Sequence, residues 1–356
     1  MRVAVDGRSL AGPGRGVARY LAGMLAALPP EVELRVVLPR EAVLPPGLGA
    51  NVHGIRHRAP SRALHGAAAV ARRPRLERLA GGADVVWLPA PAPVAVGGDT
   101  PLALTLHDLC FAERPRLFTH YERLWHRLAR AEALARRAAR VLAVSADTAE
   151  RARARYGLDA ARVLVVPAGP GDPGPSAGPD AVAAVRRRYA LPERYFLFVG
   201  ALEPRKGLER LVAALPTGEA LVLAGEGRLA GRLRGPGVHL AGPVGREEKA
   251  ALYAGALAVV LPSWCEGYGY PPLEGFAHST PAIVSDLAAL RETAGDGARY
   301  VPPGDVPALR SALSEVAGDE ALRARLAAAG ATALAARSRE RAGRALHTAL
   351  EEAASA

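Results

Sequence analysis

Residues 259–287 read VVLPSWCEGYGYPPLEGFAHSTPAIVSDL, and this stretch contains the pattern that decides the fold. An apolar run at 257–261 ends in a Ser/Gly/Pro loop, a helix is expected from Pro272, and a second apolar run follows at 282–284. Strand, loop, helix and strand in this order predict two parallel strands joined by a crossover helix. Since helices cover such sheets, the stretch predicts an α/β fold.

The same alternation of short apolar runs with amphipathic helical stretches continues through both halves of the chain. The expected strands are 2–6, 33–38, 84–88, 102–106, 141–144 and 163–166 in the first half, and 195–199, 220–224, 257–261 and 282–284 in the second. Between the two sets, residues 168–180 are so rich in Pro and Gly that we expect an interdomain hinge. Two doubly wound domains are therefore predicted, with a ligand cleft between the carboxyl ends of their sheets.

Length and composition exclude several classes of protein. A chain of 356 residues that is 50% hydrophobic has the length of two domains and enough apolar residues for both cores, so it is neither disordered nor fibrous. No apolar run is long enough for a membrane span, and the N-terminus lacks a signal-peptide pattern. Cys110 and Cys265 are too few for a disulfide framework or a thiolate zinc site. We therefore expect a soluble cytosolic protein.

The charge is unusual because almost all of the positive side chains are arginines. Lys and Arg number 46 against 35 Asp and Glu, a net charge of +11, and only Lys206 and Lys249 are lysines. In a chain that has drifted towards arginine, a remaining lysine points weakly to a site that needs a compact ammonium. The excess lies in residues 1–180, with 25 basic and 16 acidic groups, against 21 and 19 in residues 181–356. This asymmetry suggests an anionic partner for the first half.

Residues 121–140 are predicted to be a helix with an apolar face and an arginine-rich face. Leu124, Leu128 and Leu134 lie on the apolar face. One interpretation is a core-packed helix with a solvated basic face. The alternative is that this helix and the arginine-rich residues 56–78 contact anionic lipid head groups.

Two candidate sites follow strands of the first half. The glycine loop 7–17, which includes Gly14 and Gly16, opens a helix whose N-terminus favours an anion, or is an ordinary tight turn. Its glycine spacing does not match the dinucleotide fingerprint, which argues against an NAD-dependent oxidoreductase. His107 and Asp108 follow the strand at 102–106, so His107 is either a chemical group that Asp108 orients or a residue that caps the next segment.

In the second half, the strand at 195–199 leads into EPRKG at 203–207 and then into a helix. Arg205 can bind phosphate oxygens bidentately and Lys206 would add a point charge, a combination suited to a diphosphate. Lys249 lies in an amphipathic helical stretch, so we expect it on the surface beside its acidic neighbours.

The opening stretch contains two glutamates eight residues apart, Glu266 in the loop and Glu274 in the first turn of the helix. The N–H groups of residues 267–269 and the helix N-terminus suit a phosphate, and the two carboxylates suit sugar hydroxyls. Helix capping accounts for Glu274 but leaves Glu266 unexplained.

Together these motifs resemble the retaining glycosyltransferases of family 4. The similarity extends over DGRSLAGPGRGVARY, TLHDL, FLFVGALEPRKGLERL and the E-x7-E block, and thus over nearly the whole chain. It implies the GT-B architecture, in which two Rossmann-like domains face each other across a cleft and the C-terminal helix crosses back to the N-terminal domain. The implied parts are an acceptor-binding domain at 1–168, a nucleotide-sugar-binding domain at 181–333 and the returning helix at 334–356.

The resemblance also implies roles for individual residues, and the catalytic group would be His107, Arg205, Lys206 and Glu266. Glu274 would bind the ribose hydroxyls and Glu266 the donor sugar. Arg205 and Lys206 would hold the diphosphate, and His107 would lie beside the transferred sugar. The residues near the phosphates and the sugar would be Gly14, Gly16, Gly267, Tyr268 and Gly269. No metal or other cofactor is expected. Ser279 departs from the family by replacing a glycine.

We expect transfer of a hexose, with GDP-mannose the favoured donor, to a glycan, glycolipid or small-molecule acceptor. The expected setting is cytoplasmic polysaccharide biosynthesis, with peripheral contact at the inner membrane face as an open alternative. Nucleic acid is not an expected partner, because the site-like cluster of positive charge lies where a diphosphate should bind. The alternative function is a catalytically silent GT-B protein that binds a nucleotide sugar or a partner.

Overall fold

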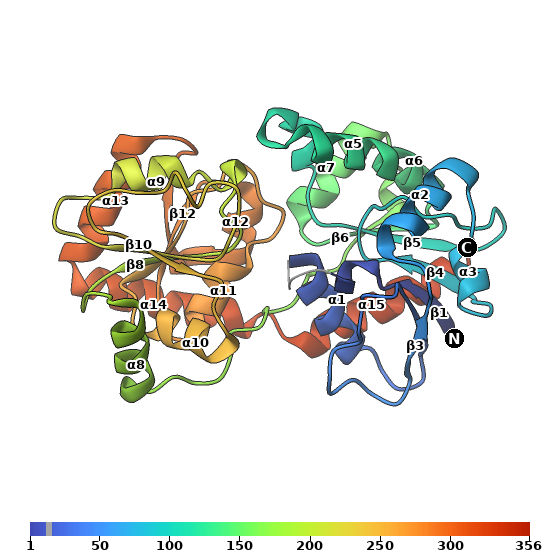
Figure 1. Ribbon diagram of the computed structural model, residues 1–356, viewed down its shortest axis with the longest axis horizontal. Coiled ribbons are helices and arrows are strands. Elements are labelled where there is room, and N and C mark those ends of the chain that lie inside the picture. Colours follow the sequence, from blue (N-terminus) through green and yellow to red (C-terminus); the bar gives the residue numbers. More distant parts are fainter. Residues whose placement is uncertain (12–15) are drawn as a thin grey trace. The chain divides into compact units, whose positions relative to one another are not determined.

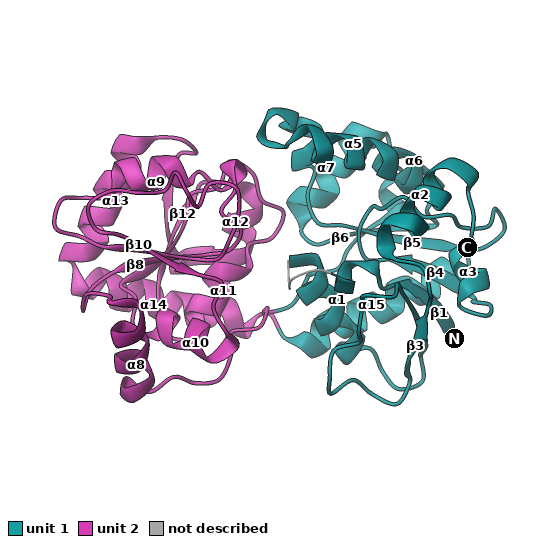
Figure 2. Ribbon diagram, viewed as in Figure 1, with its two compact units in different colours: residues 1–169, 338–356 teal, residues 170–337 magenta. Residues whose placement is uncertain are grey.

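The computed structural model describes residues 1–11 and 16–356, which divide into two compact units (Figures 1 and 2). Unit 1 comprises Met1–Gly169 and Ser338–Ala356, and unit 2 comprises Pro170–Arg337. The first boundary lies within the Pro/Gly segment 168–180. Each unit is built on one parallel sheet with helices packed on it, which confirms the predicted α/β class and the two Rossmann-like domains.

The sheet of unit 1 has seven parallel strands in the order β3-β2-β1-β4-β5-β6-β7. Its strands are β1 (Arg2–Asp6), β2 (Glu33–Leu38), β3 (Val52–Arg56), β4 (Val85–Leu88), β5 (Leu102–Leu106), β6 (Arg140–Ala143) and β7 (Val163–Val165). The chain runs from β1 to one edge, returns to β4 beside β1, and continues to the other edge. The strand order therefore reverses between β1 and β4, which is where doubly wound folds bind ligands.

The helices of unit 1 lie between its strands in sequence, except α15, which follows unit 2 at the end of the chain. They are α1 (Gly16–Ala27), α2 (Ser61–Ala71), α3 (Leu76–Leu79), α4 (Cys110–Glu113), α5 (His120–Ala129), α6 (Ala131–Arg137), α7 (Ala146–Tyr156) and α15 (Arg339–Ala354), with short 3-10 turns η1 (Arg8–Ala11), η2 (Pro115–Leu117) and η3 (Ala160–Arg162).

The sheet of unit 2 has six parallel strands in the order β10-β9-β8-β11-β12-β13. They are β8 (Phe196–Val199), β9 (Leu221–Ala224), β10 (Val238–Gly242), β11 (Ala258–Leu261), β12 (Ala282–Ser285) and β13 (Ala298–Val301). The helices are α8 (Pro179–Tyr189), α9 (Leu208–Ala214), α10 (Arg246–Ala254), α11 (Tyr270–Phe276), α12 (Ala288–Ala294), α13 (Val306–Gly318) and α14 (Glu320–Ala335), with turns η4 (Pro204–Lys206) and η5 (Gly295–Gly297). Here the order reverses between β8 and β11.

Every strand expected from the sequence is present, with ends that shift by one residue or not at all. The three strands that the sequence analysis missed, β3, β10 and β13, all lie at the edge of a sheet. Central strands such as β8 and β11 are buried along their whole length, whereas β3 and β10 have no buried residue. An edge strand has one neighbour and a partly solvated surface, so it lacks the continuous apolar run that marks a central strand.

The C-terminal helix α15 belongs to unit 1, where it lies against α1 and the sheet. It begins at Arg339 rather than at residue 334, because α14 of unit 2 continues to Ala335. At Gly343 the two helices are so close that a Cβ atom would lie 2.2 Å from the backbone oxygen of Ala27. Arg140 at the start of β6 binds Glu352 at 2.9 Å. The returning helix is therefore an integral layer of unit 1.

The helix predicted at 121–140 is two helices, because Arg130 adopts a left-handed conformation with φ of 49° between α5 and α6. Leu134 of α6 packs on the core, as expected. Leu124 and Leu128 of α5 are 50% and 44% exposed, so the expectation that they pack into the core is wrong.

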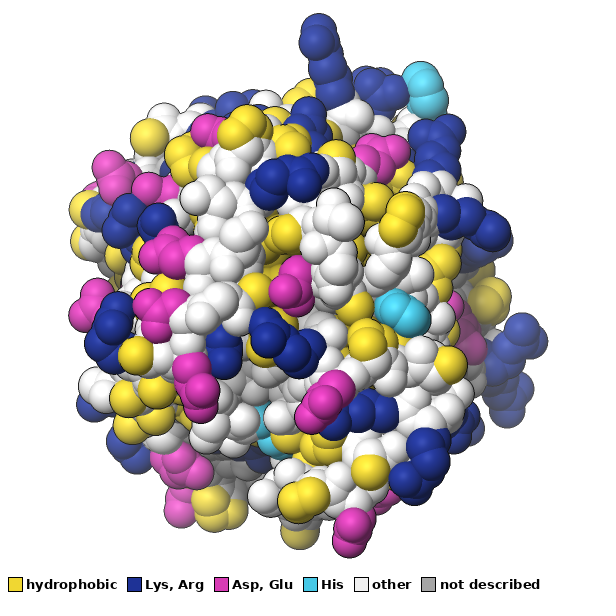
Figure 3. Space-filling model, turned by 90° about the vertical axis from the view of Figure 1, so that its left-hand side faces the viewer, with side chains coloured by type: hydrophobic (Ala, Val, Ile, Leu, Met, Phe, Trp, Pro, Cys, Tyr) yellow, Lys and Arg dark blue, Asp and Glu magenta, His cyan; other side chains and the backbone are white. Residues whose placement is uncertain are grey.

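The surface of unit 2 mixes charges of both signs. On the face shown in Figure 3, Lys and Arg side chains alternate with Asp and Glu. This pattern agrees with the small excess of basic groups in residues 181–356. Among the described residues, no helix combines the length and the apolar character that crossing a bilayer requires.

Candidate functional site

In unit 2, the candidate residues gather where the strand order reverses. Strands β8 and β11 are neighbours in the sheet although β9 and β10 separate them in sequence. Arg205 and Lys206 follow β8, and Glu266 follows β11. Because neighbouring parallel strands end at the same edge, both loops leave the sheet side by side, at the position where open α/β sheets bind ligands.

Lys206 and Glu266 form a buried ion pair. The Lys206 ammonium donates a hydrogen bond to Oε1 of Glu266, and the Ser263 hydroxyl donates to the same oxygen at 2.6 Å. Only 9% of Lys206 and 8% of Glu266 are exposed. Burial alone would raise the pKa of Glu266, but the charges of Lys206 and Arg205 and the two hydrogen bonds hold it below its ordinary value. Glu266 is therefore a carboxylate at neutral pH, able to accept hydrogen bonds from hydroxyl groups.

Arg205 lies next to this pair in η4. Its Nε binds Oε2 of Glu203 at 3.1 Å, and its carbonyl oxygen accepts the N–H of Trp264 at 2.9 Å. Gly207 follows with φ of 68°, and a Cβ there would lie 2.2 Å from the carbonyl oxygen of Pro262. Since glycine alone fits, Gly207 brings the loop after β8 against the loop after β11 and so places the two cations beside Glu266.

Gly267, Tyr268 and Gly269 connect Glu266 to α11. Gly269 has φ of 101° and touches the Leu290 side chain so closely that a Cβ would lie 2.4 Å from it. Tyr268 is 7% exposed, packs edge-on against Tyr270, and has its pKa raised to about 12 by burial. Tyr268 is therefore an uncharged packing residue.

Glu274 in α11 has no exposed surface, and both of its carboxylate oxygens have partners. Oε2 accepts a hydrogen bond from the Tyr253 hydroxyl at 2.9 Å. Oε1 lies 3.2 Å from the Lys249 ammonium and 3.3 Å from the backbone nitrogen of Asp172, which donates to it. Two segments of unit 2, α10 and the backbone at Asp172, thus fix the orientation of this carboxylate.

The expectation that Lys249 lies on the surface is wrong. Lys249 is 8% exposed, pairs with Glu274, and also donates to the carbonyl oxygen of Asp172. The amphipathic sequence pattern of α10 hid this role. Such a pattern counts every lysine as polar and therefore as exposed, although a lysine side chain is long enough to reach a buried carboxylate on a neighbouring helix. The scarcity of lysine was the signal for it, and Tyr253 and Ser263 carried no signal that reasoning from the sequence could use.

In unit 1, His107 follows β5 and turns towards the end of β4. Its Nε2 lies 2.8 Å from the carbonyl oxygen of Pro89, so Nε2 carries the proton and donates. The Tyr20 ring meets the imidazole edge-on, with ring centroids 4.7 Å apart. Burial lowers the pKa of His107, although the Pro89 hydrogen bond and the charge of Asp108 oppose the shift. The imidazole is therefore neutral at pH 7, with Nδ1 as an acceptor.

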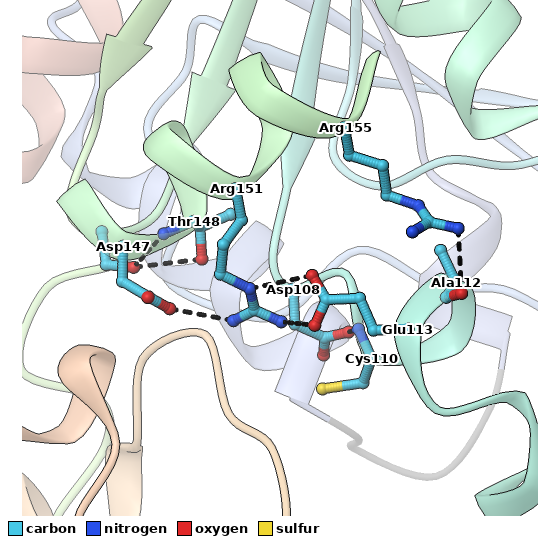
Figure 4. A network of polar contacts seen from close by, with 9 residues as sticks. Asp108, Cys110, Ala112, Glu113, Asp147, Thr148, Arg151 and Arg155 are labelled. Carbon is cyan, nitrogen blue, oxygen red and sulfur yellow. Dashed lines mark hydrogen bonds and ion pairs between the residues drawn. The ribbon is translucent and has the colours of Figure 1, made fainter.

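Asp108 does not orient His107. Its carboxylate accepts the backbone N–H of Cys110 at 2.9 Å and thereby starts α4. Figure 4 shows this turn beside Arg151 of α7, which binds Glu113 at 2.5 Å and Asp147 at 2.9 Å. Arg151 thus fastens the segment that follows His107 to the neighbouring crossover helix.

The predicted glycine loop is only partly described. Gly14 lies outside the described residues, and Gly16 is the exposed first residue of α1. In the part of the chain that the structure describes, no group of three or more His, Cys, Asp or Glu side chains is placed to hold a metal ion.

Comparison with known families gives matches in both units. A family model described as glycosyltransferase family 4 matches residues 14–169, and one described as glycosyl transferases group 1 matches residues 193–319. Together they cover most of unit 1 and of unit 2.

Among similar curated proteins are the O-antigen chain mannosyltransferase RfbU of Salmonella typhimurium, 33% identical over 136 residues, and the phosphatidyl-myo-inositol mannosyltransferase of Mycobacterium leprae, 35% identical over 153 residues. These matches cover 35% and 39% of this chain, and the chain spans only 38% and 41% of the length of those relatives.

Similar solved structures cover the whole chain at low identity. The sucrose-phosphate synthase of Thermosynechococcus elongatus matches 98% of this chain and 97% of its own with a TM-score of 0.74 at 19% identity. The Anabaena protein HepE in complex with UDP-glucose matches 98% and 99% with a TM-score of 0.72 at 18% identity. The two family models and these folds agree with the E-x7-E block at the switch point of unit 2, and the chain belongs to glycosyltransferase family 4, with the GT-B fold.

Proposed function

We propose that this protein is a retaining glycosyltransferase that moves a hexose from a nucleotide-diphosphate sugar to a glycan, a glycolipid or a small-molecule acceptor. The observation that carries the proposal is the buried Lys206–Glu266 pair at the switch point of unit 2. A carboxylate held ionised next to two cations places hydrogen-bond acceptors for hydroxyl groups beside hydrogen-bond donors for phosphate, and a nucleotide sugar needs both.

The donor would be held by unit 2. Arg205 and Lys206 would bind the diphosphate, and Glu266 would accept hydrogen bonds from the hydroxyls of the donor sugar. The backbone amides of residues 267–269 would contact sugar and phosphate, and Glu274 would accept the ribose hydroxyls.

Because Glu274 has no exposed surface, a ribose hydroxyl reaches it only if one of its present partners gives way. The N–H of Asp172, at 3.3 Å, is the longest of its contacts and the only uncharged backbone donor among them. We therefore propose that the ribose displaces Asp172 and takes over this hydrogen bond. The test is hydrogen exchange in residues 170–174, which should become faster when a nucleotide binds.

The chemical step would depend on electrostatic stabilisation of the departing nucleotide. As the glycosidic bond breaks, negative charge grows on the diphosphate, and Arg205 with Lys206 would offset it without a metal ion. The acceptor would attack on the face that the nucleotide leaves, and the leaving phosphate would take the acceptor's proton. His107, neutral and with Nδ1 as an acceptor, would bind a hydroxyl of the transferred sugar. Gly14 and Gly16 would approach the phosphates.

GDP-mannose is the donor we favour, since relatives of this chain are mannosyltransferases. UDP-glucose is the alternative, since HepE has been solved in complex with it. The assay is to incubate the protein with GDP-mannose, UDP-glucose and dTDP-rhamnose and to measure the nucleotide released. Release with one donor is expected. No turnover with any donor, together with no binding of GDP, UDP or dTDP, would refute the proposal.

A catalytically silent GT-B protein is the second candidate. Glu266→Ala and Lys206→Ala separate the two, because an enzyme should lose turnover in both variants while a binding scaffold has no turnover to lose. Arg299→Met is a matched control: it removes one positive charge from unit 2, at an exposed pair with Glu315 away from the switch point. This variant should keep wild-type turnover.

We also propose that unit 1 contacts an anionic membrane surface at the cytoplasmic face. Tyr121, Leu124 and Leu128 lie three and four residues apart on α5 and are 66%, 50% and 44% exposed, so they form one apolar stripe on the surface. Arg123 and Arg127 lie in the same helix. A stripe of this kind with flanking cations suits an anionic bilayer, where the apolar groups insert and the arginines meet phosphates.

Sedimentation with liposomes tests the membrane proposal. We expect binding to phosphatidylglycerol vesicles that weakens with salt, and little binding to phosphatidylcholine. Replacing Leu124 and Leu128 together by Ser should abolish it, whereas Val43→Ser, at a 64% exposed position elsewhere in unit 1, should not. Equal binding to both lipids, or no effect of the double change, would refute the assignment.

A further inference from the structure

The two lysines of this chain have the same role in the candidate site, because each forms a buried ion pair with a glutamate. Lys206 pairs with Glu266 and Lys249 pairs with Glu274, so each glutamate of the E-x7-E block has its own ammonium. Both lysines are at least nine-tenths buried, whereas Arg246 and Arg299, which bind carboxylates on the surface of unit 2, have side chains that are 64% and 45% exposed.

Burying a carboxylate and an ammonium together is costly unless the geometry is good and their other hydrogen-bonding positions also have partners. In the Lys249–Glu274 pair these positions have partners. The Lys249 ammonium contacts Oε1 of Glu274 and the carbonyl oxygen of Asp172, and the other carboxylate oxygen accepts the Tyr253 hydroxyl. The carboxylate cannot rotate without losing one of these partners. Its orientation is therefore set from α10, which carries both Lys249 and Tyr253.

Lys249 also holds the segment that covers Glu274. Gly171 has φ of 82°, and a Cβ there would lie 3.2 Å from Oε1 of Glu274. The next residue, Asp172, gives its carbonyl oxygen to Lys249 and its N–H to Glu274. One ammonium thus fixes both the carboxylate and the backbone that the ribose would displace.

We propose that Lys249 is a positioning residue for the ribose of a ribonucleoside diphosphate: it holds the Glu274 carboxylate correctly turned while the ribose hydroxyls replace the Asp172 N–H. The inference rests on the proposed function, since it assumes that Glu274 accepts those hydroxyls. Lys249 itself contacts neither phosphate nor sugar in this proposal.

A purely structural role would be to fasten α10 to α11. The two roles differ in what they do to ligand discrimination. Loss of a structural tie weakens every ligand of unit 2 to a similar degree, whereas loss of a positioned carboxylate removes the preference for a ribose that carries its hydroxyls.

The experiment measures the dissociation constants of GDP and UDP, and of their 2′,3′-dideoxy analogues, by titration calorimetry. Hydrogen bonds to a charged group make the wild type prefer the ribonucleotide by about tenfold or more. Lys249→Met should reduce this preference to less than about threefold while the dideoxy analogue binds with nearly unchanged affinity. The control Arg299→Met should keep the wild-type preference, since it loses the same charge at the Glu315 pair.

Each outcome decides the point. If Lys249→Met keeps the full preference, or weakens both ligands equally, Lys249 does not position the carboxylate and the inference is wrong. If the wild type binds neither nucleotide, the proposed function fails instead. Should Lys249→Met not fold, Lys249→Leu replaces it, because leucine keeps an apolar side chain at this position and removes the donor towards Glu274. A full preference in this variant would equally overturn the inference.

Discussion

The Lys206–Glu266 pair gives a prediction whose size follows from burial. Lys206→Met removes the ammonium and leaves Glu266, 8% exposed, with the Ser263 hydroxyl and the more distant Arg205. Breaking a buried pair from one side costs about 3–5 kcal/mol. Because Ser263 still donates to Oε1, we expect the lower end, about 3 kcal/mol at pH 7.5. A double variant with Glu266→Gln should recover much of this loss, since no buried charge then remains.

The pH dependence separates this cause from a simple packing defect. In the wild type, folding lowers the pKa of Glu266. The ion pair therefore stabilises unit 2 at pH values above about 4.3, the pKa of this carboxyl in the unfolded chain. This stabilisation is lost as the pH falls through the lower pKa of the folded protein. Without Lys206, burial raises the pKa of Glu266 instead, and protonation removes the unfavourable buried charge. The stability gap between wild type and Lys206→Met should therefore be widest near pH 7.5 and narrow towards pH 5.

The assay is urea unfolding monitored by fluorescence of Trp264, the one tryptophan in unit 2; Trp87 and Trp125 lie in unit 1 and would be replaced by Phe in all variants. A loss below about 1 kcal/mol, or a gap that does not change between pH 7.5 and pH 5, would refute the reasoning, because it would mean that Glu266 is not an uncompensated buried charge in the variant.

Three further predictions concern stability. Gly343→Ala should destabilise unit 1 by about 1–3 kcal/mol through its clash with Ala27, whereas Gly66→Ala, with open space around it in α2, should stabilise by about 0.5–1 kcal/mol; thermal melts compare them. Ser279→Gly should raise the midpoint of unfolding, because Ser279 has φ of 58°, a strain of about 1 kcal/mol, and Ser279→Ala should bring no gain. Burial lowers the pKa of His65 to about 4. The free energy of unfolding should therefore decrease as the pH is lowered below 6.5, by up to about 1.4 kcal/mol per pH unit. His65→Gln should flatten this slope in denaturant titrations at pH 5–7.

The central strands could be predicted from the sequence because burial on both faces demands uninterrupted apolar residues. Strands β8 and β11 meet that demand, so their ends and the loops that carry Lys206 and Glu266 could be located in advance. Edge strands such as β3 and the helix break at Arg130 could not, because neither produces an apolar pattern of its own. The break separates α5 from α6, and Leu124 of α5 is exposed.

The candidate site shows a different limit. A motif locates residues within one segment, and Glu266 and Glu274 lie in the same segment. Most of the groups that bind them come from other segments: Lys206, α10 and the backbone of Asp172. Nothing in the helical pattern of α10 distinguishes Lys249 from a surface lysine, since a pattern records the polarity of a side chain and not the position of its charged end.

Composition nevertheless contained information that the pattern lacked. In a chain with 46 basic residues of which two are lysines, both lysines are buried against carboxylates. A guanidinium is a planar fork that needs room for five donors, whereas an ammonium fits a pocket that offers one carboxylate oxygen and one carbonyl. The environment of Lys249, with Oε1 of Glu274 and the Asp172 carbonyl, is such a pocket. The fit of a compact cation is therefore a physical reason for lysine at these two positions, and the same reasoning identifies Lys249 as a partner of the site.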